Sequence, residues 1–410
     1  MIAAARADRR VLVALGTGTA VAVAAWIFGL LQLWQTSVPS DLTLPDLDPS
    51  RYFTQDQLDR AASYQAFLRI DALLALIAQV VALGIFAVKG PAFVRESAAG
   101  RIGTGMLLGM LGLGFVWFAQ LPFGLAELWW ERQHDVSSLG YVSWLINYFL
   151  AAGGEFLFIS LALLIVMALT GVWRRAWWIA AAPALVAVLL AFGFLQPYLI
   201  PDQHPVENQA IAADAEELAA AEGIRGTTVR VQDTHNLGGS PNAEATGLGP
   251  TQRVILWDTL LRRFPRPEVR VVLAHEFVHL SRHHLWKGFG FMALLALPIA
   301  LITALVTRRR GGLYEPTAVP LAIFVVAVLL FLTLPLQTAF TRRLESEADW
   351  VALSTTHAPG AMGSLFERFG RLSRAQPDPP GWDQFLFGNH PSIIQRIEMA
   401  QAWRERNPGH

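Results

Sequence analysis

The segment PEVRVVLAHEFVHLSRHH, residues 267–284, contains the pattern HExxH. Side chains four residues apart lie on one face of a helix, so His275 and His279 are spaced to bind one Zn²⁺ ion. Glu276 then lies beside the metal, where its carboxylate is placed to take a proton from bound water. Pro267 suits the first turn of a helix, and the apolar residues around the motif predict a face shielded from solvent. The segment therefore predicts a metal-binding helix.

A zinc-dependent hydrolase needs a third protein ligand and an open position for water. The extended motif of the metzincin class is excluded, because Arg282 and Leu285 stand where that class has Gly and His. The chain contains no cysteine, so the third ligand must be His, Asp or Glu. The alternative to a metal-binding motif is that HEFVH matches HExxH by chance, since only three positions of the pattern are fixed.

A second acidic segment, TRRLESEADWVAL at 341–353, supplies a candidate third ligand. Glu345 and Asp349 are four residues apart, so a ligand and a supporting carboxylate can project from one helix face. Such a carboxylate typically accepts the second N–H of a liganding histidine. Glu347 is a rival ligand, but it points to a different face. A solvated acidic turn is the other interpretation of this cluster.

The composition indicates a membrane protein. Hydrophobic residues make up 53% of the 410 residues and charged residues only 16%, whereas roughly a quarter of an average soluble domain is charged. The 32 basic and 32 acidic residues balance, which gives no indication of a nucleic-acid partner.

The apolar residues gather in blocks of the length needed to cross a bilayer, about 20 residues. Seven blocks predict about seven transmembrane helices, at 11–34, 71–88, 103–125, 149–172, 177–200, 289–306 and 317–338. The sequence therefore predicts a predominantly α membrane protein in four parts: 1–200 with five spans, 201–288 with HEFVH, 289–338 with a two-span hairpin, and 339–410 with the third ligand.

The polar segment 201–288 predicts a small α+β unit. A helix is expected over ENQAIAADAEELAAAEG, and TTVRVQD alternates as a half-buried strand does. RVILWDTLL predicts a second strand that runs into a helix. Between them, NLGGSPNAEATGLGP predicts a loop or a short edge strand.

Together these motifs resemble the CAAX prenyl protease 1 family, and the chain looks like a bacterial member. HEFVH, RRLESEAD and NHPSIIQRI occur in the family's order, and the similarity extends to RYFTQDQLDRAASYQAF and LPFGLAELWWERQHDVSS. It covers about residues 50–410. The resemblance implies an integral-membrane zinc metalloendopeptidase of the gluzincin type, with seven helices enclosing a chamber that the zinc domain caps.

The resemblance also implies a role for each matching residue. One zinc per chain would be held by His275, His279 and Glu345, with Glu276 as catalytic base and Asp349 behind the ligands. The matching substrate residues are Asn242 and Ala243 at a strand edge, and His390 and Arg396 as groups that position the substrate or stabilise the oxyanion. His284 matches a further histidine with no ligand role implied. Pro241 and Glu244 depart from the family pattern, which leaves the substrate preference open.

The expected function is hydrolysis of a peptide or protein substrate in a multi-pass membrane protein, with lipid-modified or membrane-associated substrates among the candidates. A bacterial plasma membrane is expected, and the resemblance implies a cytoplasmic zinc domain. Basic residues are nearly balanced across the loops and do not decide the orientation. The alternatives are a quality-control protease of the HtpX type and a non-catalytic chamber that binds lipid or peptide.

Overall fold

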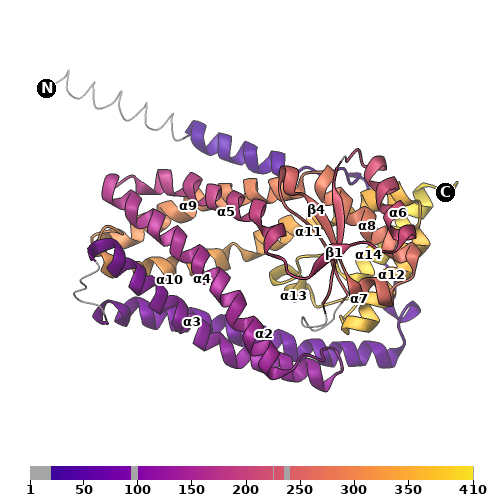
Figure 1. Cartoon of the computed structure of the whole chain (residues 1–410), viewed down its shortest axis with the longest axis horizontal. Coiled ribbons are helices and arrows are strands. Elements are labelled where there is room, and N and C mark those ends of the chain that lie inside the picture. Colours follow the sequence, from indigo (N-terminus) through magenta and orange to yellow (C-terminus); the bar gives the residue numbers. More distant parts are fainter. Residues whose placement is uncertain (1–19, 94–99, 225, 235–240, 410) are drawn as a thin grey trace.

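The computed structural model describes residues 20–93, 100–224, 226–234 and 241–409. Membrane-type helices form one end of the molecule and an α+β part forms the other (Figure 1). The helices that overlap the predicted spans from residue 71 onward are α2 (Gln55–Lys89), α3 (Gly100–Gln133), α4 (Tyr141–Val172), α5 (Trp177–Leu199), α9 (His284–Thr307), α10 (Val319–Leu332) and α11 (Leu334–Thr356). The α+β part contains β1 (Gln203–Pro205), α6 (Gln209–Ala221), β2 (Thr228–Gln232), β3 (Ala243–Thr246), β4 (Arg253–Trp257), α7 (Asp258–Arg263), α8 (Arg266–Ser281), α12 (Pro359–Ser373), α13 (Gly381–Leu386) and α14 (Ile393–Arg406).

The expected class, a predominantly helical membrane protein with a small sheet, is confirmed. Among the described residues, five helices are long and apolar enough to cross a bilayer: Gln55–Ala92, Gly100–Gln133, Tyr141–Val172, Trp177–Leu199 and His284–Arg310. A sixth candidate is the pair Pro316–Leu332 and Leu334–Thr356. The first predicted span lies partly outside the described residues, and its described part contains a shorter helix, Ala20–Leu33.

The last predicted span, 317–338, is broken by a bend of 49° between α10 and α11. Pro335 in the first turn of α11 has no N–H to donate to the preceding turn, so the helix cannot continue straight. The Thr333 hydroxyl bonds back to the Leu329 carbonyl at 2.9 Å and so caps α10. The bend separates the apolar α10 from α11, which carries the acidic motif into the α+β part.

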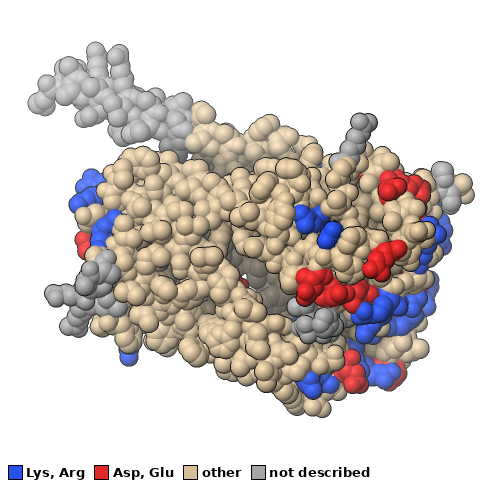
Figure 2. Space-filling model, viewed as in Figure 1, with Lys and Arg blue, Asp and Glu red and all other residues tan. Residues whose placement is uncertain are grey.

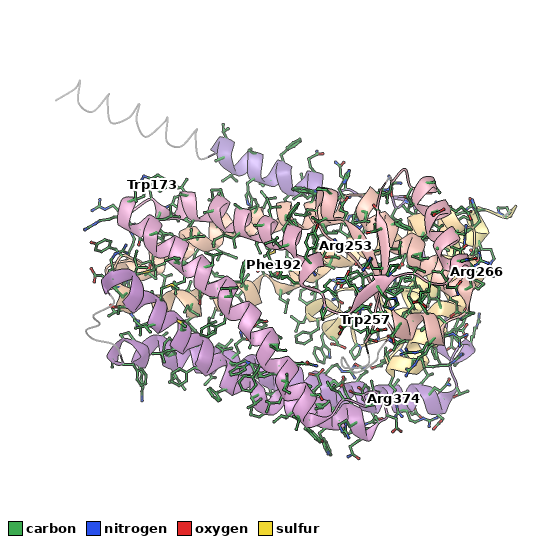
Figure 3. All side chains as sticks on the ribbon, viewed as in Figure 1. Trp173, Phe192, Arg253, Trp257, Arg266 and Arg374 are labelled. Atoms are coloured by element: carbon green, nitrogen blue, oxygen red, sulfur yellow. The ribbon has the colours of Figure 1, made fainter. Side chains whose placement is uncertain are left out.

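On the face shown in Figure 2, charged side chains gather at the two ends of the molecule, and the surface between them carries almost none. This distribution suits a bilayer around the middle, because charges are costly in hydrocarbon. Trp173, which follows α4, lies at the end far from Arg253 and Trp257 of the α+β part (Figure 3). The surface is hollowed where the helices meet that part (Figure 2).

The sheet has the order β1-β2-β4-β3. β2 and β4 are parallel, whereas β1 and β3 run antiparallel to their neighbours, so β3 forms one edge. The predicted helix and strands of this part are present as α6, β2 and β4, and the expected edge strand is β3. The short strand β1 is an addition, because its sequence QHP has no alternating pattern.

Helix α8 lies in the core of the α+β part. Leu273 and Phe277 are fully buried in one cluster with Leu256 of β4 and Leu353 of α11. At the start of α8, Arg266 forms an ion pair with the buried carboxylate of Asp214 on α6 at 2.7 Å. α8 is thereby held on several sides, which fixes the direction of the side chains of HEFVH.

Candidate metal centre

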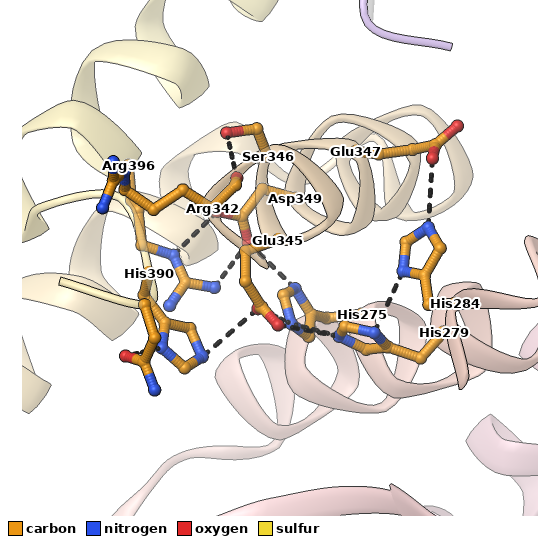
Figure 4. Close-up of polar contacts among 11 residues, drawn as sticks. His275, His279, His284, Arg342, Glu345, Ser346, Glu347, Asp349, His390 and Arg396 are labelled. Atoms are coloured by element: carbon orange, nitrogen blue, oxygen red, sulfur yellow. Dashed lines mark hydrogen bonds and ion pairs between the residues drawn. The ribbon is translucent and has the colours of Figure 1, made fainter. Parts of the chain in front are cut away.

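The two histidines of HEFVH lie one turn apart on α8, on the side that packs against α11. His275 is 8% exposed, and the Nε2 atoms of His275 and His279 lie 3.1 Å apart. Glu345 projects from α11 between them, with its Oε2 3.2 Å from His275 Nε2 and its Oε1 3.6 Å from His279 Nε2. Two segments 70 residues apart in sequence therefore bring three metal-type donors together (Figure 4).

The three donors fit a zinc ion. Ligands about 2.1 Å from a tetrahedral zinc are separated by about 3.4 Å, close to the separations of these atoms. Nitrogen of two histidines and oxygen of one glutamate is a known donor set of catalytic zinc sites. In this structure the candidate ligand atoms of His275, His279 and Glu345 all lie within 4.8 Å of one another.

Asp349 lies behind His275 and accounts for the orientation of its ring. Its Oδ1 atom is 2.9 Å from His275 Nδ1, and its side chain is fully buried. Arg396 of α14 donates to both oxygens of Asp349, at 2.6 and 2.7 Å. Because the carboxylate accepts the Nδ1 proton, the Nε2 lone pair of His275 points to the metal position.

Glu347 is directed away from the three donors. His284 Nε2 and Lys287 Nζ each lie 3.0 Å from its Oε2. His284 in turn lies 3.0 Å from His279, measured between their Nδ1 atoms. The geometry therefore favours Glu345 over Glu347 as the third ligand, and it brings His284, which had no assigned role, into contact with a candidate ligand.

Glu276 lies in the pocket next to the donors. Burial raises the pKa of its carboxylate to about 7, with His275 opposing the rise and Glu345 adding to it. The backbone N–H of Ala245 in β3 donates a hydrogen bond to this carboxylate. A carboxyl group with a pKa near neutrality suits a general base.

The pocket has a volume of about 280 Å³ and reaches from the donors to the edge strand β3. Asn242, Ala243, Glu244, His390 and Arg396 line it together with the α8 and α11 residues. His390 is half-exposed, with its Nε2 3.3 Å from Glu345 Oε2. All the predicted site residues therefore line this one pocket. Arg396 forms hydrogen bonds with Asp349 and is not free to contact a substrate through those atoms.

The backbone of β3 is oriented for strand addition. The Trp257 N–H donates to the Asn242 carbonyl at 3.0 Å, which makes these two a hydrogen-bonded pair. In an antiparallel pair such positions alternate, so the N–H and C=O of Ala243 and Ala245 point away from β4. The Ala245 N–H points to Glu276, and the Ala243 groups point to the edge of the sheet that has no further strand among the described residues.

A helix carrying HExxH, a glutamate on a second helix and a membrane-type bundle define a membrane metallopeptidase. Residues 205–404 match peptidase family M48. The chain is thus an enzyme of the metallopeptidase type, and its residues 205–404 are similar to peptidase family M48.

Three similar proteins support this assignment. The chain is 25% identical over 419 residues to an uncharacterized metalloprotease, YhfN, of Bacillus subtilis, which covers 95% of this chain and 97% of the relative. It is 30% identical over 135 residues to a CAAX prenyl protease 1 homolog of Dictyostelium discoideum, covering 32% and 30% of the two chains. The crystal structure of S. mikatae Ste24p has the same fold, with a TM-score of 0.71 over 93% of this chain and 97% of that chain at 16% identity. The resemblance to the CAAX prenyl protease 1 family is confirmed.

Proposed function

We propose that the chain is a zinc-dependent endopeptidase that binds one Zn²⁺ through His275, His279 and Glu345. The observation that carries the proposal is the triangle of donor atoms, 3.1 to 3.6 Å apart, at the end of a pocket beside an open strand edge. A zinc ion in this position supplies Lewis-acid chemistry, since it polarises a carbonyl and makes a bound water more acidic.

Glu276 is the proposed general base, and it receives the proton of the attacking water on its carboxylate. It lies next to the donors without being one of them, and its raised pKa favours proton uptake. His390 is half-exposed toward the same pocket, so it is proposed to donate to the substrate carbonyl oxygen as negative charge develops there. Arg396 is proposed to act through Asp349, because its Nε and Nη2 atoms both donate to that carboxylate.

The substrate is proposed to bind as a strand added to β3. The outward backbone groups of Ala243 supply hydrogen bonds to an extended peptide. Asn242 directly precedes β3 and lines the same pocket. A peptide in this position lies across the pocket that contains Glu276. The proposed substrates include lipid-modified peptides, as the name of the Dictyostelium relative suggests, and unmodified peptides.

Two alternatives remain. A quality-control protease of the HtpX type would share the metal site, but four candidate spans precede the α+β part among the described residues, and these argue against close similarity. A non-catalytic chamber would bind lipid or peptide without cleaving it. It is disfavoured because Glu276, which such a protein does not need, is present and lies at the donors.

The proposed location is a bacterial plasma membrane with the zinc domain in the cytoplasm. The chain has no cysteine, so a single cysteine at exposed Glu405 gives one labelling site on the α+β part. A membrane-impermeant maleimide should label Glu405→Cys only after the cells are permeabilised. Labelling on intact cells would place the zinc domain outside.

Elemental analysis tests the metal assignment. Purified full-length protein should contain one zinc per chain, and His279→Ala should lose most of it. A protein that contains no zinc and takes up none after zinc is added would contradict the proposal.

A further inference from the structure

A buried line of polar residues extends from His279 to the N-terminal part of the chain. His279 Nδ1 lies 3.0 Å from His284 Nδ1, and His284 Nε2 lies 3.0 Å from Glu347 Oε2. His284 is 4% exposed and Glu347 3%. The Glu347 carboxylate also accepts from Lys287 Nζ at 3.0 Å, and from the backbone N–H and the hydroxyl of Ser37 at 2.7 and 2.9 Å.

The hydrogen-bond chemistry of this line fixes the proton positions. A carboxylate only accepts, so His284 must donate to Glu347 through Nε2–H. Lys287 already balances the charge of Glu347, so a neutral His284 leaves no net charge in the line. The Nδ1 atom of neutral His284 then carries a lone pair and accepts the Nδ1–H of His279. His279 is left with its Nε2 lone pair directed at the other two donors.

This line mirrors the support of the other histidine. His275 is held by Asp349 and Arg396, whereas His279 is held by His284, and behind it by Glu347 and Lys287. The two carboxylates are two residues apart on α11 and point in different directions (Figure 4). Each candidate ligand histidine therefore has a buried partner that sets its tautomer.

The N-terminal segment completes the second line. The helix Ala20–Leu33 packs along α9, with Trp26 Nε1 donating to the Leu294 carbonyl at 2.8 Å. Lys287 Nζ contacts the Gln35 carbonyl at 3.3 Å, and Ser37 supplies two of the hydrogen bonds to Glu347. Residues about 240 positions before HEFVH thus hold the carboxylate that orients His284.

We propose that His284 is a positioning residue that fixes the ring and proton of His279 for zinc binding, and that the Ser37 segment supports it by holding Glu347. The inference rests on the proposed zinc site. In addition, the affinity for zinc is proposed to depend on the segment around Ser37, which we call the N-terminal strap and which lies outside the residues that match family M48.

The test is the dissociation constant for Zn²⁺ of purified full-length protein, measured by competition with a chromophoric chelator. Loss of a partner of a liganding histidine typically weakens binding about 10- to 100-fold, and His284→Phe should fall in that range. His284→Gln should recover most of the loss, because its amide both accepts and donates. His283→Asn is the matched control, since His283 is exposed and has a left-handed backbone that Asn tolerates.

Melting of the metal-free protein separates positioning from folding. His284→Phe should change the zinc affinity far more than the melting temperature without metal. Unchanged zinc affinity in His284→Phe would overturn the inference. If that variant does not fold, Glu347→Ala removes the acceptor of the His284 Nε2–H and is measured in its place.

The strap is tested by a double variant. Ser37→Pro removes the backbone donor and the hydroxyl, whereas Ser37→Ala removes the hydroxyl alone, so Pro should weaken zinc binding more than Ala. In the His284→Phe background, or the Glu347→Ala background in its place, Ser37→Pro should have little further effect, because the hydrogen bonds that link Ser37 to His279 are already lost. If the fold losses of zinc affinity in the two single variants multiply in full in the double variant, Ser37 does not act through Glu347 and His284. Wild-type protein that binds no zinc at all would instead contradict the proposed function.

Discussion

The Nδ1 atom of His275 lies 2.9 Å from Oδ1 of Asp349, and no other side chain of the described residues is hydrogen-bonded to that nitrogen. The contact joins α8 to α11 inside the core. Arg396 of α14 donates two hydrogen bonds to the same Asp349 carboxylate. The ring of His275 is therefore oriented before any metal binds. Because the His275 side chain needs no reorientation, it loses little conformational entropy when zinc binds, which favours tight zinc binding.

Asp349→Ala should weaken zinc binding about 10- to 100-fold, because His275 loses the acceptor that sets its tautomer. Arg396→Gln should have a smaller effect in the same direction, since Arg396 acts through Asp349. The measurement is zinc affinity by chelator competition. Arg368→Gln serves as control, because it breaks an ion pair with Glu268 away from the pocket. Equal effects of Arg368→Gln and Asp349→Ala would mean that the loss reflects general destabilisation.

Glu345→Ala should remove most of the zinc, because one of three protein ligands is lost. Glu347→Ala should retain zinc with reduced affinity, since Glu347 contacts His284 and not the metal position. Elemental analysis of both purified variants distinguishes them. Full zinc content in Glu345→Ala, together with loss in Glu347→Ala, would show that the other carboxylate is the ligand.

Ala243→Pro should reduce peptide cleavage more than Ala243→Val. Proline removes the outward N–H of the edge strand, whereas valine keeps it and suits a strand. Asn242→Ala should also lower cleavage, and none of the three changes should release zinc. The measurement is kcat/KM on one peptide, with zinc content determined in parallel. Wild-type activity in Ala243→Pro would exclude strand addition at this position.

The candidate metal ligands could be picked out from the sequence because each rests on local spacing. His275 and His279 are one helical turn apart, and Glu345 and Asp349 repeat that spacing on α11, so a regular helix already fixes which side chains share a face. The membrane helices were likewise predictable from apolar length. These features depend on contacts close in sequence.

The remaining features depend on contacts between distant segments. Ser37 meets Glu347 across 310 residues, and no local pattern marks either residue as a partner of the other. The role of His284 becomes visible only when α9 is placed beside α11. The bend after α10 was missed because the apolar run continues through Leu334, although Pro335 indicated it.

The central claim is that Glu276 activates water at a zinc site, and peptide cleavage by the purified full-length protein tests it most directly. Wild-type protein should cleave, lose activity with a chelator and regain it with zinc. Glu276→Gln should keep its zinc and its melting temperature, while its rate falls by about 10²- to 10⁴-fold. Near wild-type turnover by Glu276→Gln, or cleavage that persists after the zinc is removed, would contradict the account.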